Sequence, residues 1–130
     1  MVKKAVNTAV EISREYEKKL FAVHVISIEF LFDTLPTVQE FEEAFSEKLL
    51  TEGKQVTDYV ENSGRAANVE VESAILRGIP AEEIIGFAER NDIDLIVMDT
   101  HGRTGIKRFM LGSVAEKVVR HATKLVLVVR

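Results

Sequence analysis

Residues 99–118, DTHGRTGIKRFMLGSVAEKV, contain the residue types that a phosphate-binding loop uses. Gly102 and Gly105 permit backbone conformations that other residues avoid. A helix that begins near Ser113 would turn its positive end toward this loop. The stretch also holds three cations that attract anions: Arg103, Lys107 and Arg108. These features indicate a phosphate site, although Asp99 at the start of the stretch would repel a phosphate group.

A purely structural role explains the same residues. Ser113 and Glu116 have the S-x-x-E spacing of a capping box, in which the serine oxygen accepts from a helix N–H and the glutamate reaches back. The glycines then serve as turn residues. The stretch lacks the terminal Gly-Lys-Ser/Thr of a P-loop and is not a dinucleotide fingerprint. Spacing alone therefore leaves both interpretations open.

The elements that position this loop alternate between helix and strand. Helical periodicity covers about 2–16, 38–60, 80–88 and 113–121. Apolar runs predict buried strands at 20–28, 94–99 and 124–130, and a more polar edge strand at 68–78. Alternation of this kind is typical of an α/β domain: an open, mostly parallel sheet with helices on both faces. Ligands of such sheets bind beyond the carboxyl ends of the strands, where the 99–112 loop begins.

Composition narrows the class of protein. The 130 residues, 46% hydrophobic and 29% charged, predict one domain, residues 1–130. Seventeen Lys and Arg against twenty-one Asp and Glu give a net charge of −4, which disfavours nucleic-acid binding. There is no cysteine, no apolar run of about 18 residues for a membrane span, and no signal-peptide pattern at the start. We expect a soluble cytoplasmic protein.

The histidines give little evidence of catalysis. His24 lies in a predicted strand, where a packed structural role is expected, and His121 in the last turn of a helix suits the helix dipole. His101 lies at the mouth of the predicted site, where ligand contact and a structural role are equally expected. No carboxylate–histidine–nucleophile set and no metal-ligand motif is present. We therefore predict no catalytic residue and no metal ligand.

The segment DIDLIVMDTHGRTGIKRFMLGSVAEKVVRHATKLVLVVR resembles the C-terminal half of the universal stress proteins, the family of the bacterial protein UspA. The upstream segment RGIPAEEIIGFAERNDIDLIVM and the strand AVHVIS are also similar to this family. The resemblance implies a fold like that of the adenine nucleotide alpha hydrolases. It also implies binding of ATP or another adenine nucleotide, with Mg²⁺ arriving on the nucleotide.

The resemblance also implies the binding residues. ATP-binding members carry G-x2-G-x9-G-[S/T], whose last three conserved positions fall here on Gly102, Gly112 and Ser113, and whose first falls on Asp99. By position, the nucleotide-binding residues are Val25 and Met98 at the base and ribose; Asp99, His101, Gly102 and Arg103 at the ribose-phosphate turn; and Gly112, Ser113 and Val114 at the phosphates.

The sequence departs from the family pattern at two places. Asp99 replaces a glycine, and a carboxylate within about 4 Å of a phosphate costs roughly 1 kcal/mol in water and about 4 kcal/mol at an effective dielectric constant near 20. The same carboxylate suits a ribose hydroxyl or a metal ion. The family's first strand, which lies centrally in its sheet, is missing before Val2. We expect a truncated chain, direct pairing of 20–27 with 94–98, or a partner's strand between them.

The final strand predicts association. The run LVLVV (125–129) is apolar on both faces and forms a sheet edge. The resemblance implies antiparallel pairing of the strand 124–129 in a homodimer. Residues 30–35 hold a second apolar cluster, which suits a lid or a partner contact. We expect a stress-response module that binds an adenine nucleotide in the loop 98–114 and signals through dimer or partner contacts. The alternatives are a dimeric interaction protein without nucleotide and a slow ATPase or autophosphorylating protein, with Ser113 as the residue modified.

Overall fold

The computed structural model describes residues 3–28, 37, 39, 45–100 and 111–130. The helices are α1 (Lys3–Glu15), α4 (Leu50–Ala66), α5 (Pro80–Arg90) and α6 (Ser113–His121), and a π-helical turn, η1 (Phe45–Leu49), leads into α4. The strands are β1 (Leu20–Ser27), β2 (Val71–Gly78), β3 (Leu95–Asp99) and β4 (Leu125–Val129). Within the described ranges, the predicted order of helices and strands is confirmed. Helix α4 continues to Ala66, beyond the predicted end at residue 60.

The strands form two parallel pairs. β1 pairs with β2, from Leu20 opposite Val71 to Ser27 opposite Gly78. β3 pairs with β4, from Leu95 opposite Leu125 to Asp99 opposite Val129. The two pairs are separate two-stranded sheets, so the direct pairing of 20–27 with 94–98 that we considered does not occur. The expected edge position of β2 is confirmed, because β1 is its one hydrogen-bonded neighbour among the described strands.

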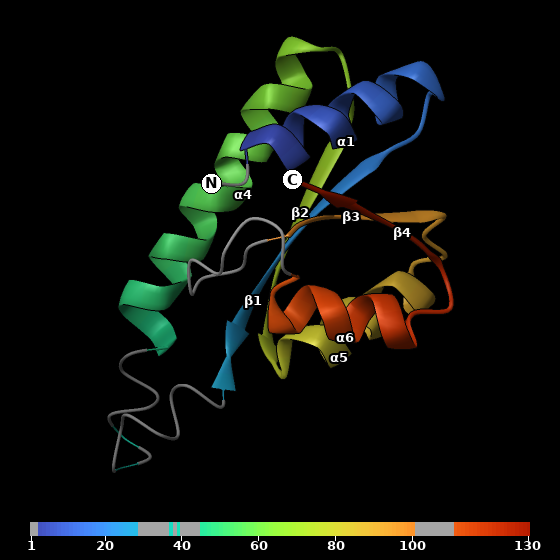
Figure 1. Ribbon diagram of the computed structural model, residues 1–130. Helices are drawn as coiled ribbons and strands as arrows, with labels where there is room; N and C mark the ends of the chain where they lie inside the picture. Colours follow the sequence, from blue (N-terminus) through green and yellow to red (C-terminus); the bar gives the residue numbers. More distant parts are fainter. Residues whose placement is uncertain (1–2, 29–36, 38, 40–44, 101–110) are drawn as a thin grey trace.

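Helices cover both faces of these strands, as predicted. α4 packs on β1 and β2, and α1 packs on β3 and β4 from the same side. α5 contacts β1 and β2 from the opposite side, next to α6, which contacts β4 (Figure 1). The fold is therefore an α/β arrangement of three layers, with parallel strands in the middle layer.

The main cluster of buried side chains lies between α1, β1 and α4. It consists of Val6, Val10, Ala22, Val60 and Val69, with Leu20, Tyr59, Ala67 and Val71 packed around it. These residues come from the periodic faces of α1 and α4, from β1, and from residues 67–71 between α4 and the start of β2. Their positions agree with the apolar pattern of the sequence.

Two glycines let α4 approach the sheet closely. A Cβ at Gly53 would lie 2.8 Å from Cδ2 of His24 in β1, and a Cβ at Gly64 would overlap Val71 Cγ2 in β2. Both glycines are buried. Gly53 is thus not merely an interruption of a helix, because its missing side chain makes room for the half-buried imidazole of His24. This contact supports the structural role expected for His24.

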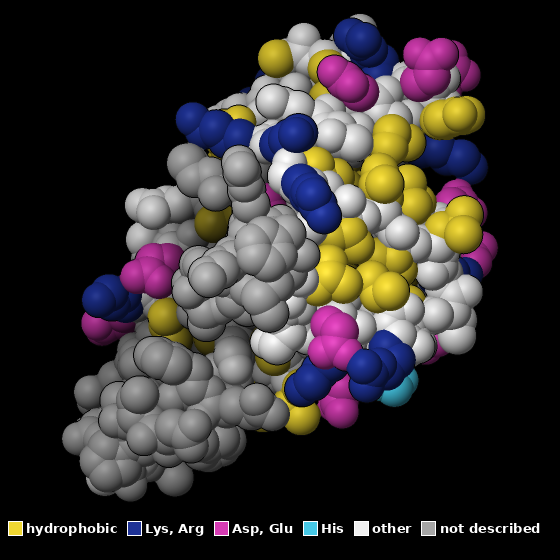
Figure 2. All heavy atoms as spheres, viewed as in Figure 1, with side chains coloured by type: hydrophobic (Ala, Val, Ile, Leu, Met, Phe, Trp, Pro, Cys, Tyr) yellow, Lys and Arg dark blue, Asp and Glu magenta, His cyan; other side chains and the backbone are white. Residues whose placement is uncertain are grey.

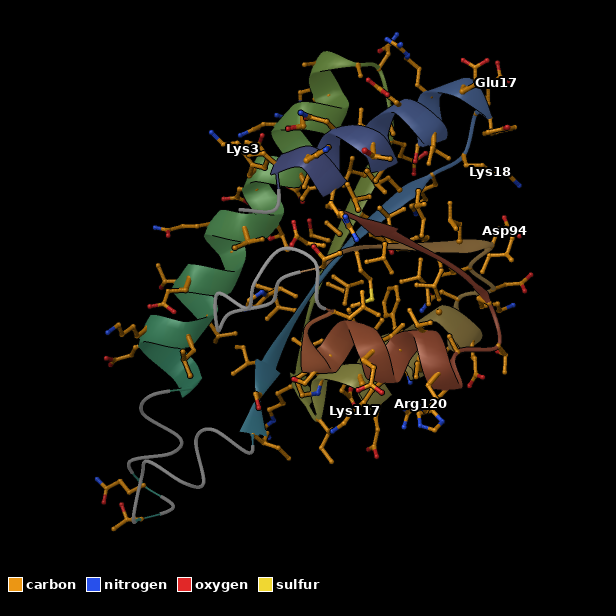
Figure 3. The ribbon with its side chains drawn as sticks, in the orientation of Figure 1. Lys3, Glu17, Lys18, Asp94, Lys117 and Arg120 are labelled. Atoms are coloured by element: carbon orange, nitrogen blue, oxygen red, sulfur yellow. The ribbon has the colours of Figure 1, made fainter. Side chains whose placement is uncertain are left out.

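Lysine side chains form ion pairs with carboxylates near the starts of β1, β2 and β3. Lys18 Nζ lies 3.4 Å from Asp94 Oδ2, which joins the entry to β1 with the entry to β3 (Figure 3). Lys19 Nζ lies 3.0 Å from Glu72 Oε1 and 3.5 Å from Glu70 Oε2. The hydrogen bond from Lys19 to Glu72, with the charges of both glutamates, raises the pKa of Lys19 above its ordinary value of 10.5. These exposed pairs fix the amino-terminal edge, opposite the edge where the predicted site lies.

The last strand is more exposed than predicted. Leu125 is 74% exposed and Leu127 37% exposed, whereas Val129 is buried. Leu125 and Leu127 share one face of β4, and Figure 2 shows hydrophobic side chains gathered between α1 and α6, where β4 runs. The prediction of a buried strand at 124–130 is therefore wrong for Leu125 and Leu127, although Val129 at the end of the same face is buried.

Candidate functional site

The predicted site begins where β3 ends and α6 begins, and two backbone hydrogen bonds join these ends. Thr100 N–H donates to the carbonyl of Val129 at 3.0 Å, which extends the ladder between β3 and β4 by one residue. Gly112 N–H donates to the carbonyl of Thr100 at 2.7 Å. The chain therefore leaves β3 and returns to the same point before it enters α6. This closure brings Asp99 and Thr100 next to Gly112 and Ser113.

Among the described residues, no side chain caps the start of α6. Gly112 is the N-cap residue, with φ −64° and ψ 159°, and its carbonyl accepts the first helical hydrogen bond, from Glu116 N–H at 2.9 Å. The capping box that we considered as the structural interpretation of Ser113 and Glu116 does not form, because Gly112 is the N-cap residue and Ser113 lies one position inside the helix. The Glu116 carboxylate instead pairs with Arg120, one turn further along α6.

This helix start can hold an anion. The first N–H groups of an α-helix have no acceptor within the helix, and they carry the positive end of the helix dipole. At α6 these groups belong to residues 113–115, and no side chain in the described part of the chain caps them. Gly112 is buried, Ser113 exposed and Val114 half-buried, so the helix start is reached by solvent on the Ser113 side.

The base-side residues predicted from the sequence lie in different sheets. Val25 is half-buried in β1, two residues before that strand ends, and pairs with Leu76. Met98 and Asp99 are half-buried at the end of β3, where they pair with Val128 and Val129. The fold thus brings Asp99 to the start of α6, while Val25 belongs to the other strand pair.

Several predicted residues lie outside the described part of the chain. These are His101, Gly102 and Arg103 of the predicted site, the further loop residues Gly105, Lys107 and Arg108, and the apolar cluster at 30–35. Thr100 was not among the predicted site residues. The sequence feature that could have included Thr100 is its position directly after an apolar strand run, at the carboxyl edge of the sheet, where the ligands of such sheets bind.

Two surface pockets of the described structure lie away from this edge. One, of about 450 Å³, is lined by the end of α4 and the start of β2, and the other, of about 520 Å³, by the ends of α1 and α4. Both are open and polar and contain none of the predicted site residues. Among the described residues, no group of three or more His, Asp or Glu side chains could hold a metal ion. None of the helices that the structure describes is long and apolar enough to cross a membrane.

Comparison with known proteins gives the family. The model of the universal stress protein family matches residues 2–130. The universal stress protein MJ0531 of Methanocaldococcus jannaschii is 38% identical over 126 residues, which make up 97% of this chain and 73% of that protein. The chain therefore belongs to the universal stress protein family, as the resemblance of residues 92–130 and of the upstream segments predicted.

Solved structures confirm the fold. The structure of MJ0577, a universal stress protein of the same organism, is 31% identical with a TM-score of 0.78, and the match covers 95% of this chain and 85% of that chain. More distant structures with the same fold include an Archaeoglobus fulgidus universal stress protein in complex with dAMP, at 23% identity and a TM-score of 0.69, with 97% of this chain and 85% of that one covered. Another is a universal stress protein in complex with cAMP, at 20% identity and a TM-score of 0.68, with 98% of this chain and 85% of that one covered.

Proposed function

We propose that this universal stress protein binds an adenine nucleotide, ATP or AMP, at the loop 98–114, and that nucleotide occupancy changes its contacts with a second copy or another cytoplasmic partner. In this proposal Gly112, Ser113 and Val114 hold the phosphates, and Met98 and Val25 lie at the base and ribose. His101, Gly102 and Arg103 complete the turn. Mg²⁺ would be bound through the nucleotide phosphates.

The observation that carries the proposal is the start of α6. Its N–H groups receive no cap from a side chain of the residues that the structure describes, and Gly112, the N-cap residue, is joined to the end of β3 by its hydrogen bond to Thr100. A phosphate group satisfies such N–H groups and is stabilised by the helix dipole. The dAMP and cAMP complexes of structures with the same fold support an adenine nucleotide as the ligand.

Asp99 decides how tightly phosphates bind. Its carboxylate lies at the end of β3, one residue before Thr100, and therefore near the start of α6. A like charge near a phosphate lowers affinity, while a carboxylate that accepts a hydrogen bond from a ribose hydroxyl raises it. We propose that the carboxylate of Asp99 faces the ribose and accepts a hydrogen bond from a ribose hydroxyl. We also propose that its negative charge weakens binding of the more highly charged nucleotides.

A substitution at the N-cap tests the proposed phosphate site. Gly112→Val adds a branched side chain at a buried position beside the first N–H groups of α6. We expect the affinity for AMP, measured by displacement of a fluorescent ATP analogue, to fall at least tenfold. Gly86→Ala in α5 is the control and should leave displacement unchanged. Equal affinity in the wild type and Gly112→Val would contradict a phosphate site at this helix.

The exposed face of β4 supports a second candidate function, that of a dimeric interaction protein. Leu125 and Leu127 present apolar side chains on a strand with a free edge in the described structure. Exposed strands and apolar patches of this kind pair with other chains. Under this candidate, the protein dimerises through residues 124–129 with or without nucleotide, and Gly112→Val alters only the free energy of unfolding.

A further inference from the structure

We infer that the edges of β1 and β3 that face each other bind an extended apolar segment of a separate polypeptide, which adds one strand between the two parallel pairs. The inference goes beyond the proposed nucleotide function and does not depend on it. The bound segment is about as long as β3, which has five residues, and runs parallel to both strands. It would join β1–β2 and β3–β4 into a single sheet.

β1 and β3 each have one edge without a neighbouring strand in the described structure. Leu20 N–H donates toward β2 at 2.9 Å, and Thr100 N–H donates toward β4 at 3.0 Å. Backbone groups alternate in direction along a strand, so those of Val23 in β1 and Val97 in β3 point to the opposite edges. These edges therefore present backbone donors and acceptors that no described strand uses.

The two free edges face each other across the middle layer of the fold. Lys18 Nζ, just before β1, lies 3.4 Å from Oδ2 of Asp94, just before β3. Paired strands lie about 4.8 Å apart, so a strand between β1 and β3 would separate them by roughly 10 Å, which these two side chains together can span. Helix α1 contacts β1, β3 and β4 from one side, and α5 and α6 cover the other side (Figure 1). A segment between the edges would thus be covered on both faces.

Apolar side chains along both edges are only half-buried. All five residues of β3 have this intermediate exposure. So do Val23 and Val25 in β1, and Phe21, whose ring meets that of Phe87 in α5 with centroids 5.6 Å apart. Parallel strands with helices on both faces are normally buried on both faces. The part-exposed side chains are the apolar surface that an inserted strand would cover.

The surroundings specify the chemistry of the partner segment. Helices on both faces require apolar side chains at every position, whereas a strand at an open edge alternates between apolar and polar residues. α1 ends beside the start of β1, so its positive end lies near the strand ends, with Lys3 and Lys4 in its first turn. Asp99 is an opposing charge at this edge. An acidic residue after the apolar run is favoured beside the helix starts, which sets the parallel direction.

A designed peptide, Lys-Lys-Val-Ile-Val-Ile-Val-Glu-Glu, tests the inference with the full 130-residue chain. Fluorescence anisotropy of the labelled peptide measures its affinity. Two variants carry N-methyl groups, one on both isoleucines and the other on the last two valines. Because alternate residues of a strand face opposite edges, each variant loses N–H groups on one edge only. A third peptide, Glu-Glu-Val-Ile-Val-Ile-Val-Lys-Lys, has the terminal charges exchanged.

We expect the unmodified peptide to bind and to raise the unfolding temperature of the protein, because it binds the folded state and not the unfolded chain. Both N-methylated peptides should bind at least tenfold more weakly, since a strand between two neighbours forms hydrogen bonds along both of its edges. The peptide with exchanged charges should bind about two- to fivefold more weakly, the range for a charge beside a helix end.

The results that overturn the inference are distinct. Loss of affinity in only one of the N-methylated peptides would show addition at an outer edge, that of β2 or β4. Equal affinity of the unmodified and both N-methylated peptides would show non-specific adsorption. Equal affinity of the peptide with exchanged charges would overturn the parallel direction. Peptide affinity that falls as the protein concentration rises would assign the edges to a second copy of this chain, and the absence of binding by the folded chain would overturn the inference outright.

Discussion

Three helix glycines provide a graded test of how α4 packs against the sheet. Replacement of a glycine by alanine inside a helix stabilises it by about 0.8–1 kcal/mol when the added methyl group meets open space. At Gly86 in α5 the nearest atom to a new Cβ is Arg90 Nη1, at 2.9 Å, the far end of a flexible side chain. Gly86→Ala should therefore stabilise the protein by about 0.5–1 kcal/mol.

The same substitution in α4 should act in the opposite direction. At Gly53 the new methyl group meets the His24 ring at 2.8 Å, and at Gly64 it meets Val71 Cγ2 and the backbone carbonyl of Val69, the latter at 3.2 Å. Overpacking of this kind costs about 1–3 kcal/mol, which offsets or exceeds the gain in helix propensity. We expect a loss of about 0–2 kcal/mol for Gly53→Ala and a larger loss, about 2 kcal/mol, for Gly64→Ala.

Urea unfolding followed by circular dichroism at 222 nm, a wavelength that reports helix content, measures the three variants. The decisive experiment adds His24→Ala, which removes the ring that Gly53→Ala would meet. In that background Gly53→Ala should become stabilising, with a coupling of about 1–3 kcal/mol between the two sites. The reasoning would be refuted if Gly64→Ala were as stable as Gly86→Ala, or if Gly53→Ala had the same effect with and without His24.

Three further predictions concern the turns, the charged edge and the last strand. Glu17 has φ 54° just after α1, so Glu17→Gly should stabilise the protein by roughly 0.5–1 kcal/mol in the same unfolding assay, and a loss of stability would contradict the strain assigned to this turn. The folded-state pKa of Lys19 is raised, so the stability that its ion pairs contribute is present below pH 10.5 and is lost as the pH rises through the folded-state value. Lys19→Met should remove this loss of stability at alkaline pH, which thermal unfolding between neutral pH and about pH 11 measures. The same pH dependence in the variant and the wild type would contradict the prediction. If β4 mediates a homodimer, Leu125→Lys should yield monomers in sedimentation velocity while Val56→Lys, at an exposed apolar residue of α4, stays dimeric, and equal behaviour of the two would exclude β4 as the interface.

Local signals predicted the elements well. Pro80 marks the first turn of α5, with Glu82 and Glu83 close behind, and the predicted helix at 113–121 matches α6 residue for residue. These features depend on the few residues around each helix end, so the sequence carries them directly. The family resemblance added the prediction of a nucleotide site around Asp99 and Gly112, which composition alone leaves open.

Features that depend on distant parts of the chain were not predictable in the same way. The role of Gly53 depends on His24, which lies in another element, and the exposure of Leu125 depends on which helix covers β4. The capping box at Ser113 and Glu116 does not form, because Gly112 is the N-cap residue and Ser113 is the first residue of the helix. The hydroxyl of Thr100 has no hydrogen-bond partner among the described residues. This could not be predicted from the sequence, because it depends on the backbone geometry that joins β3 to α6.

The measurement that tests the central claim most directly is a calorimetric titration of Mg-ATP into the folded wild-type chain, with Asp99→Gly titrated in parallel. The account predicts binding by both proteins, with affinity about tenfold or more higher for Asp99→Gly, because the substitution removes the negative charge that weakens binding of highly charged nucleotides. Heats indistinguishable from dilution in both folded proteins would contradict nucleotide binding at this site.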